Sequence, residues 1–350
     1  MITYLKENNT DLSVDKSNMR QVILDFPKQF KVGFGAGAKI KNQISKIKNI
    51  NNVIVCGMGG SALPGELLKL ICTNYLKTTK AGVHIHRNYG LPYYIKSQKL
   101  KVKSQLIVCI SYSGNTEETL SSYREAIKMG LPIVSIASGG KLLELSKKYK
   151  SPVVIIPGGI QPRSALGYQF AALIKILENL KIIKNIEKEI LNAAENFAPK
   201  KLDGQGKNLA KKLLDKIPVV YSSQRYKALA YIWKIKFNEN TKIPAFWNYF
   251  PELNHNEMVG YANASKLLHV LILRDKNDYP RNLKRMGLTA ELLKNRGLKV
   301  EFIEIVGKSI WEKILNNLIL ADWVSYYMAI FEGVDPTPVA MVEEFKKKLE

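Results

Sequence analysis

Short apolar runs alternate with amphipathic segments along residues 52–180, and this alternation limits the possible folds more than any other feature of the chain. NVIVCG, GVHIHR, LIVCIS, LPIVSIA and PVVIIP are nearly continuous in apolar residues, which is typical of strands buried on both faces of a parallel sheet. Helical spacing predicts helices near residues 62–73, 117–128, 142–148 and 165–181. Such strand–helix repeats predict βαβ units and a doubly wound parallel sheet.

The alternation resumes after residue 215 and predicts a second α/β unit. PVVYSS, LLHVLILRD and KVEFIEIVG are its expected strands, and helices are expected over residues 226–237, 281–296 and 310–331. The two halves show no sequence repeat strong enough to prove a duplication.

A charged, largely helical segment separates the two expected units. It covers residues 183–215 and is interrupted by proline and glycine, so we place the domain boundary there. The first domain is expected to span residues 1–195, including a leading helix within residues 17–34, and the second to span residues 205–350. A length of 350 residues agrees with two domains rather than one.

Composition indicates a soluble, cytoplasmic protein. The chain is 46% hydrophobic and 24% charged, its start lacks the apolar core of a signal peptide, and no run of 18 apolar residues occurs. The three cysteines (Cys56, Cys72 and Cys109) form neither a CxxC pair nor a Cys/His cluster with zinc spacing. We therefore expect no disulfide, no structural metal and no membrane segment.

The net charge of +23 has several possible meanings, including a nucleic-acid surface. The lysines are spread over the whole chain, however, and are not gathered with aromatic residues into one recognition segment. A general lysine bias therefore explains the charge better than nucleic-acid binding does. The charge could still attract an acidic metabolite.

The segment LIVCISYSGNTEET (residues 106–119) contains the strongest candidate for a phosphate site. Ser111, Ser113 and Thr116 follow an expected buried strand and precede an expected helix. Hydroxyls at a helix N-terminus can surround a phosphate, because the free N–H groups and the helix dipole favour negative charge. Taken alone, the segment could equally be an ordinary strand–helix turn with Asn115 or Thr116 as N-cap.

A second loop of the same kind occurs earlier, in VIVCGMGGSALPGE. Gly59 and Gly60 permit close backbone approach to a ligand, and Ser61 opens the following helix. The spacing is not GxGxxG, and no acidic residue ends the next expected strand, so a dinucleotide site is disfavoured. Two such loops suit a single phosphate group better. The second half lacks comparable loops, which places the expected phosphate site in the first domain.

Arg163 lies in PGGIQPRSALGY, after the last expected strand of the first domain. An isolated arginine is usually a surface charge. A Gly/Pro-rich loop at the carboxyl edge of a parallel sheet favours a position facing a ligand instead.

Further candidates lie in KFNENTKIPAFWNYFPELNHNEMVGY. Glu239 ends an expected helix, and His255 lies with Glu257 in a polar loop. A His/Glu pair can serve acid–base chemistry, although both carboxylates could equally be solvated groups at helix ends or in loops. The other three histidines (His84, His86 and His269) lie in strand-like runs and are expected to be structural.

Together these motifs resemble one family. GMGGSA, SYSGNTEE, the PR of PGGIQPRSALGY, FNEN, HNE and the C-terminal DPTPVAMVEEFKKKL are similar, in this order, to the bifunctional phosphoglucose/phosphomannose isomerases of the sugar isomerase (SIS) domain superfamily. SYSGNTEE is shared by SIS domains generally, whereas FNEN, HNE and the C-terminal pattern are more specific. The resemblance implies an α/β fold of two SIS-type domains with doubly wound parallel sheets and flanking helices.

The resemblance also implies a function and a set of roles. The activity would interconvert glucose 6-phosphate and mannose 6-phosphate with fructose 6-phosphate through a cis-enediol(ate), with no metal or redox cofactor. The implied phosphate-site residues are Gly59, Gly60, Ser61, Ser111, Ser113 and Thr116. Arg163 would stabilise the enediolate, Glu239 would be the catalytic base, and His255 would assist ring opening.

The resemblance further implies a homodimer in which His255 serves the site of the neighbouring subunit. Lys346 would contact the ligand, with the adjacent Lys347 and Lys348 as alternatives. Three other functions remain open at this point: an isomerase specific for glucose 6-phosphate, a phosphosugar-sensing regulator and an amino-sugar enzyme. A sensor needs no catalytic base and no Glu239, and an amino-sugar synthase would need an ammonia source that the sequence does not indicate.

Overall fold

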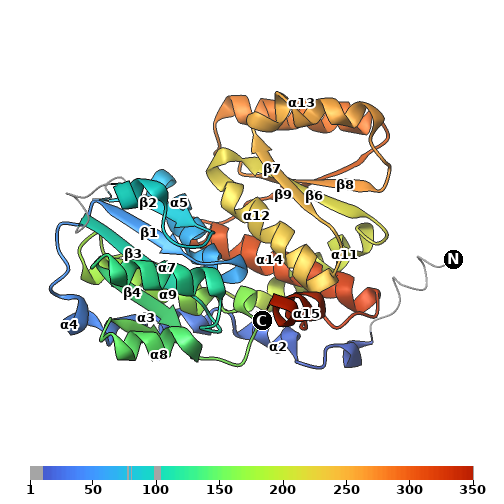
Figure 1. Cartoon of the computed structure of the whole chain (residues 1–350). Helices are drawn as coiled ribbons and strands as arrows, with labels where there is room; N and C mark the ends of the chain where they lie inside the picture. Colours follow the sequence, from blue (N-terminus) through green and yellow to red (C-terminus); the bar gives the residue numbers. More distant parts are fainter. Residues whose placement is uncertain (1–10, 77–78, 80, 98–103, 350) are drawn as a thin grey trace. The chain divides into compact units, whose positions relative to one another are not determined.

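The computed structural model describes residues 11–349 apart from residues 77–78, 80 and 98–103 (Figure 1). The first ten residues, which bear on the absence of a signal peptide, lie outside the described part. The chain divides into two compact units, which are treated separately below. One is Asp25–Phe197, and the other joins the described residues before Asp25 to those from Ala198 onward.

The unit Asp25–Phe197 contains a five-stranded parallel sheet with the order β2-β1-β3-β4-β5. Its strands are β1 (Asn52–Cys56), β2 (Gly82–His86), β3 (Gln105–Ile110), β4 (Ile133–Ala137) and β5 (Val153–Ile155). Its helices are α3 (Lys28–Ala38), α4 (Lys41–Ile44), α5 (Leu63–Asn74), α6 (Tyr93–Ser97), α7 (Glu117–Lys128), α8 (Gly140–Lys148), α9 (Leu166–Asn179) and α10 (Glu187–Glu195). Every residue of β3 and β4 is buried, as their continuous apolar sequence predicts.

The order of this sheet creates one special position at its carboxyl edge. β2 is added on one side of β1, and β3 is added on the other side. The direction of strand addition therefore reverses between β1 and β3. Ligands of open α/β sheets bind at such a reversal, outside the carboxyl ends of the strands. The two hydroxyl-bearing loops identified in the sequence follow these two strands.

The other unit contains a four-stranded parallel sheet with the order β7-β6-β8-β9. Its strands are β6 (Ile217–Ser223), β7 (Phe246–Phe250), β8 (Leu268–Arg274) and β9 (Lys299–Glu304). Its helices are α2 (Met19–Asp25), α11 (Asp203–Lys212), α12 (Lys227–Lys236), α13 (Pro280–Lys294), α14 (Ile310–Phe331) and α15 (Ala340–Leu349). The expected α/β class, with two parallel sheets and flanking helices, is confirmed.

Sequence patterns did not predict β7. Its sequence, FWNYF, contains a polar residue in the middle and lies among the loop-forming residues that flank the HNE motif. β7 is an edge strand paired only with β6, and most of its residues are exposed or half-buried. Its aromatic side chains therefore lack the pattern of a strand buried on both faces.

The expected single helix within residues 17–34 is two helices, α2 and α3. Proline at residue 27 separates them, because its ring removes a backbone donor and clashes with a continuing helix. α2 also groups with the second sheet, although residues 1–195 were assigned to the first domain. The Arg20 guanidinium pairs with Asp203 at 3.2 Å and lies 5.7 Å from the ring centre of Trp323, and these contacts hold α2 in that unit.

α14 is the central helix of its unit. It is long and apolar enough to cross a membrane by length and composition, but 94% of its most apolar 18-residue window is buried inside the protein. Its apolar residues cover the whole circumference, which is the pattern of a helix enclosed by a protein core.

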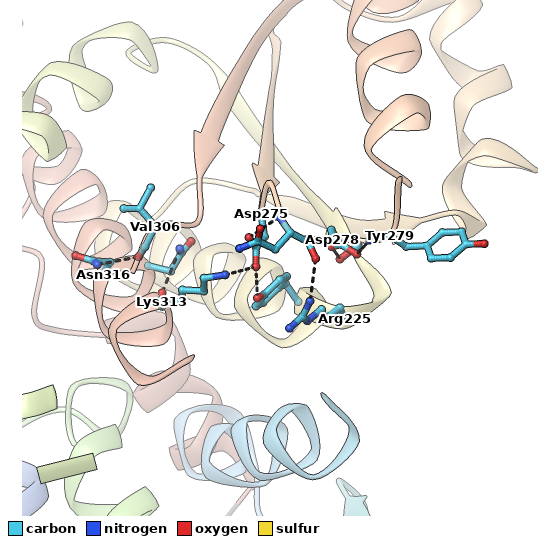
Figure 2. A network of polar contacts seen from close by, with 11 residues as sticks. Arg225, Asp275, Asp278, Tyr279, Val306, Lys313 and Asn316 are labelled. Carbon is cyan, nitrogen blue, oxygen red and sulfur yellow. Dashed lines mark hydrogen bonds and ion pairs between the residues drawn. The ribbon is translucent and has the colours of Figure 1, made fainter. Parts of the chain in front are cut away.

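An ion network closes the carboxyl edge of the second sheet (Figure 2). Asp275, just after β8, accepts hydrogen bonds from Lys313 Nζ at 2.6 Å and from the Tyr226 hydroxyl at 2.5 Å. Asp278 accepts one from the hydroxyl of Ser223, the last residue of β6. These contacts join the loops after β6 and β8, between which strand addition reverses in this sheet. The protein's own carboxylates thus occupy the place where an open α/β sheet would bind an external anion.

The surroundings of Asp275 favour its ionised form. Burial is the largest influence on the pKa of this carboxyl group and acts to raise it, but the hydrogen bonds from Lys313 and Tyr226 outweigh burial. The pKa of Asp275 is therefore lowered from its ordinary value of 3.8. A carboxylate with a lowered pKa stabilises the folded state above its unfolded-state pKa, and this contribution is lost as the pH falls through the folded-state value.

We predict that Asp275→Asn lowers the stability of this unit by about 2 kcal/mol at neutral pH, since it leaves the charge of Lys313 without its ionised partner. The loss should begin to shrink as the pH falls below about 4 and should disappear below the lowered pKa of the folded state, where the wild-type carboxyl group is also neutral. Denaturant midpoints of the two proteins at about pH 7 and about pH 3 measure this difference. Glu304→Gln is the control, because its exposed pair with Arg274 should contribute about 0–1 kcal/mol. An equal loss at both pH values would contradict the ionic role of Asp275.

Candidate active site

The loops after β1 and β3 are joined directly at the reversal point of the first sheet. The Ser61 hydroxyl accepts a hydrogen bond from the backbone N–H of Tyr112 at 3.0 Å. The Tyr112 hydroxyl in turn accepts one from the N–H of Ile160 at 3.2 Å, in the loop that leads to Arg163. Three loops that are distant in sequence thus form one structure at the carboxyl edge of the sheet.

Two glycines allow these loops to approach so closely. A Cβ atom at Gly60 would lie 2.5 Å from the backbone nitrogen of Arg163, and a Cβ atom at Gly114 would lie 1.8 Å from the carbonyl oxygen of Gly139. Gly114 also has a positive φ of 75°, which disfavours any other residue. Gly60 and Gly114 are therefore required by backbone contact within this unit, whereas a Cβ atom at Gly59 would meet no atom within 4 Å.

The SYSGNT loop presents its hydroxyls in a compact group. Ser111 and Thr116 are hydrogen-bonded through their side-chain oxygens at 2.9 Å, and the Ser113 hydroxyl accepts the N–H of Asn115 at 3.2 Å. Thr116 occupies the N-cap position of α7, but its side chain meets Ser111 instead of capping the helix. The first-turn N–H groups of α7 and the nearby hydroxyls are the donors that an anion needs at a helix N-terminus.

Arg163 lies inside this unit, in the 3₁₀ turn Pro162–Ser164, and is fully buried. Its burial excludes the ordinary explanation of an isolated surface charge. A guanidinium is always protonated, and in a region of low dielectric constant its charge acts strongly on a nearby anion.

Two buried glutamines, which the sequence patterns did not single out, support the Arg163 turn. Gln29 of α3 donates to the carbonyl of Ser164 at 2.8 Å and accepts the N–H of Gly167 at 3.0 Å, so it satisfies backbone groups at the start of α9. Gln169 donates to the carbonyl of Pro162 at 3.0 Å. Nothing in the local sequence marks Gln29, because it lies more than 130 residues from its partners.

Glu239 belongs to the other unit, where it lies on a π-helical turn, Phe237–Thr241, that extends α12. Isolated π-helical turns occur frequently at functional sites. Glu239 is half-buried, while its neighbours Asn240 and Thr241 are buried. Lys242 donates from its ammonium group to the carbonyl of Glu239 and, at 3.1 Å, to the carbonyl of Pro336. This lysine ties the Glu239 turn to the segment that precedes α15.

His255 is exposed and lies just after the short turn Glu252–Asn254 that follows β7. The other three histidines differ in burial, since His84 is exposed like His255 whereas His86 is half-buried. His269 is buried and its pKa is lowered, chiefly by burial. His84 and His86 contact Asn52 Oδ1 at 3.3 Å and the Gly90 carbonyl at 3.0 Å, respectively.

Glu257 is a structural anchor for the His255 segment rather than a solvated loop carboxylate. It accepts hydrogen bonds from the Tyr221 hydroxyl and from the Asn248 side-chain amide. Tyr221 and Asn248 are register partners on β6 and β7, so the carboxylate spans two neighbouring strands. Tyr261 joins the same group through the Tyr221 hydroxyl, and burial is the main cause that raises its pKa to about 12. Sequence patterns did not indicate these partners, because β7 itself was not predicted.

Lys346 lies on α15, an exposed helix, and pairs with Glu343 at 2.9 Å. The neighbouring Lys348 pairs with Glu344 at 2.6 Å. The candidate residues therefore form two sets. The two phosphate loops and Arg163 are brought together in the unit Asp25–Phe197, whereas Glu239, His255 and Lys346 belong to the unit of the second sheet. Among the residues that the structure describes, no cluster of three His, Cys, Asp or Glu side chains could hold a metal ion.

Comparison with known proteins gives three main findings. Residues 202–349 match the family model of the bacterial phospho-glucose isomerase C-terminal SIS domain. The chain is 36% identical to a bifunctional phosphoglucose/phosphomannose isomerase of Caldicellulosiruptor bescii, over 95% of this chain and 98% of that protein. It is 32% identical to a D-glucosamine-6-phosphate 4-epimerase of Sulfolobus acidocaldarius, over 88% of this chain and 92% of that protein.

A solved structure shares the fold at low sequence identity. The C-terminal domain of glucosamine-fructose-6-phosphate aminotransferase from Francisella tularensis matches with a TM-score of 0.68 and 17% identity, over 91% of this chain and 98% of that one. This likeness concerns the fold alone. The sequence identity to the Caldicellulosiruptor protein, which extends over nearly the full length of both chains, shows that this protein belongs to the family of bifunctional phosphoglucose/phosphomannose isomerases.

Proposed function

We propose that the protein interconverts glucose 6-phosphate and mannose 6-phosphate with fructose 6-phosphate. The observation that carries this proposal is the joining of two hydroxyl-rich loops at the reversal point of the first sheet, next to a buried arginine. Family membership supports the reaction class, since the relatives with this name act on both sugar phosphates. The half-buried Glu239 supplies the base that a sensor would not need.

The phosphate group would bind the donors around Ser61, Ser111, Ser113 and Thr116. Each hydroxyl can donate a hydrogen bond, and the N-terminus of α7 favours the negative charge. Binding at this end would hold the sugar without taking part in the proton transfer.

Glu239 would remove the proton from C2 of the open-chain aldose, and the electron pair would move onto the carbonyl oxygen at C1 to give an enediolate. A proton then passes from the C2 hydroxyl to the C1 oxygen, and return of the first proton to C1, as the carbonyl forms at C2, gives the ketose. Glucose 6-phosphate and mannose 6-phosphate differ only at C2, so both yield the same intermediate. A positioned base contributes about 10²–10⁴-fold to such a step.

Arg163 would stabilise the developing oxyanion. A positioned charge in a site shielded from water contributes about 3–4 kcal/mol to such stabilisation. The complete burial of Arg163 supports this role. His255 would exchange a proton with the ring oxygen to open the cyclic sugar, a role that an imidazole can perform as a general acid or base.

We further propose a cytoplasmic homodimer in which His255 serves the partner's site. The exposed position of His255 on a segment anchored by Glu257 supports a role toward a second chain. All three cysteines are free, which supports a reducing compartment.

We predict that Glu239→Gln lowers kcat by at least about 10²-fold while leaving the substrate affinity nearly unchanged, because the amide cannot accept the proton. A coupled assay for fructose 6-phosphate, together with a thermal shift by substrate, measures both quantities. Glu304→Gln, at an exposed glutamate of β9 that pairs with Arg274, is the matched control and should keep wild-type turnover. Wild-type turnover of Glu239→Gln would contradict the assignment of the base.

The choice of substrates tests the reaction itself. Glucose 6-phosphate and mannose 6-phosphate should both give fructose 6-phosphate, and D-glucosamine 6-phosphate should not be epimerised at C4. Turnover of glucose 6-phosphate alone would favour the glucose-specific isomerase. Epimerisation of the amino sugar would indicate the activity for which the Sulfolobus relative is named. If no product forms at high enzyme concentration, the result would favour a sensor.

We predict that Ser113→Ala weakens phosphosugar binding by about 10- to 100-fold, as expected for the loss of one hydrogen bond to a charged group. Ser113 is exposed, so the substitution should leave the fold intact. The KM values for glucose 6-phosphate and the dissociation constant of inorganic phosphate should rise together. Ser121→Ala on α7 is the control, since its hydroxyl accepts the N–H of Gly90 away from the loop. An unchanged phosphate affinity would remove Ser113 from the site.

We predict that mixing Glu239→Gln with His255→Ala subunits restores part of the lost activity. If sites are shared, a heterodimer contains one site with neither defect and should regain up to about half of wild-type turnover. A statistical mixture, in which about half of the dimers are heterodimers, should regain up to about a quarter. Activity after exchange, with mixed dimers verified by native mass spectrometry, measures this. No recovery in verified heterodimers would show that each site is built within one chain.

A further inference from the structure

The π-helical turn Phe237–Thr241 is an irregular ending of α12 that its own backbone does not explain. A π-helical turn is less favourable than a continued α-helix and persists where neighbouring groups hold it. The groups that hold this turn therefore determine where Glu239 lies.

Two buried polar contacts attach the end of α12 and its π-helical turn to α14. Lys236 Nζ lies 2.5 Å from Asp322 Oδ1, with side chains only 2% and 7% exposed. Asn240 donates from its side-chain amide to the Ser325 hydroxyl at 2.8 Å, and both residues are fully or almost fully buried. Lys236 and Asn240 are four residues apart and therefore lie on one face of their helical segment. Asp322 and Ser325 are three residues apart and lie on one face of α14. The contacts form two successive attachments on either side of Glu239.

Ser325 is suited to its part of this arrangement. Its hydroxyl donates to the carbonyl of Ala321, one turn earlier in α14, at 2.8 Å. The same hydroxyl lies 3.2 Å from the carbonyl of Asp322, so its single proton is directed at these two carbonyls of α14 and its oxygen lone pairs are left for the amide of Asn240. The orientation of both groups is thereby determined.

The turn is also closed at its far end. The Thr241 hydroxyl donates to the carbonyl of Phe237 at 2.5 Å, and the Asn238 amide donates to the carbonyl of Ile243 at 2.9 Å. Lys242, in the left-handed region with φ of 59°, ends the helix. Both asparagines of the FNEN motif thus hold the backbone, while the glutamate between them remains half-buried.

We propose that Asn240 and Ser325 are positioning residues for Glu239. Their hydrogen bond holds the π-helical turn against α14 and thereby sets the place of the carboxylate, and neither residue need touch the substrate. The inference rests on the proposed role of Glu239 as the base. Proton transfer depends steeply on geometry, since a displacement of about 1 Å can lower the rate about 100-fold.

The neutral pair is the right one to test, because truncation of the buried Lys236–Asp322 pair would leave an unpaired charge and could unfold the protein. Ser325→Val and Ser325→Thr have side chains of the same shape, but only threonine keeps the oxygen that accepts from Asn240. We expect kcat for fructose 6-phosphate formation to fall about 10- to 100-fold in Ser325→Val with KM changed less than about twofold, and to stay near wild type in Ser325→Thr.

Two further variants separate positioning from general stability. Asn317→Ala removes another buried polar side chain of α14, whose amide bonds only within the same helix in the described structure, to the Lys313 carbonyl at 3.4 Å. It should lower the melting temperature without lowering kcat. Asn240→Ala should lose at least as much kcat as Ser325→Val, and the double variant should lose no more than Asn240→Ala, since the hydrogen bond between the two residues is absent from all three variants.

The proposal is overturned if Ser325→Val and Ser325→Thr have equal kcat values, or if the losses of the two single variants multiply in the double variant. It is also overturned if Asn317→Ala lowers kcat as much as Ser325→Val. Failure of the proposed function is distinguishable, because the wild-type protein would then form no fructose 6-phosphate. Failure of the base assignment is distinguishable as well, because Glu239→Gln would then remain active. An inactive Glu239→Gln beside a fully active Ser325→Val overturns only the positioning role.

Discussion

The reversal of strand addition in a parallel sheet is the constraint on which the candidate site depends. In the first sheet it brings the ends of β1 and β3 together, and the hydrogen bond from the Tyr112 N–H to the Ser61 hydroxyl joins the loops that follow them. Because Gly60 has no Cβ atom, the backbone of the Arg163 turn can lie close to the position that this atom would take. The hydrogen-bond donors of the candidate phosphate site and a buried guanidinium therefore lie in one unit because of the order of its strands.

In the second sheet the direction of strand addition also reverses, between β6 and β8, but residues of a different kind lie at this point. Asp275 and Asp278 bind to Lys313, Tyr226 and Ser223 across it, so the anion is supplied by the protein itself. These hydrogen bonds favour the ionised form of Asp275, as its lowered pKa indicates. The two reversal points therefore differ in role. The one between β1 and β3 carries the hydrogen-bond donors of the candidate phosphate site, and the one between β6 and β8 stabilises the unit that contains Glu239 and His255.

The candidate acid–base groups depend on support from residues far away in sequence. The turn around Glu239 is attached to α14 through Asn240 and Ser325, and the His255 segment is attached to β6 and β7 through Glu257. In both cases a polar side chain next to the candidate residue makes the attachment. The FNEN and HNE motifs thus combine a group available for chemistry with neighbours that hold the backbone.

Periodicity alone determined the α/β class, both parallel sheets and most helices, because buried parallel strands and amphipathic helices leave local patterns in the sequence. Motif chemistry identified the family and predicted a phosphate site in the loops after β1 and β3. Only the tertiary structure decided the edge strand β7, the break between α2 and α3 with the grouping of α2, the π-helical turn and the burial of Arg163. It also decided the partners of Gln29, Glu257 and Asn240. These features depend on contacts between residues tens to more than a hundred positions apart, and hydrogen bonds over such separations leave no periodic pattern in the sequence.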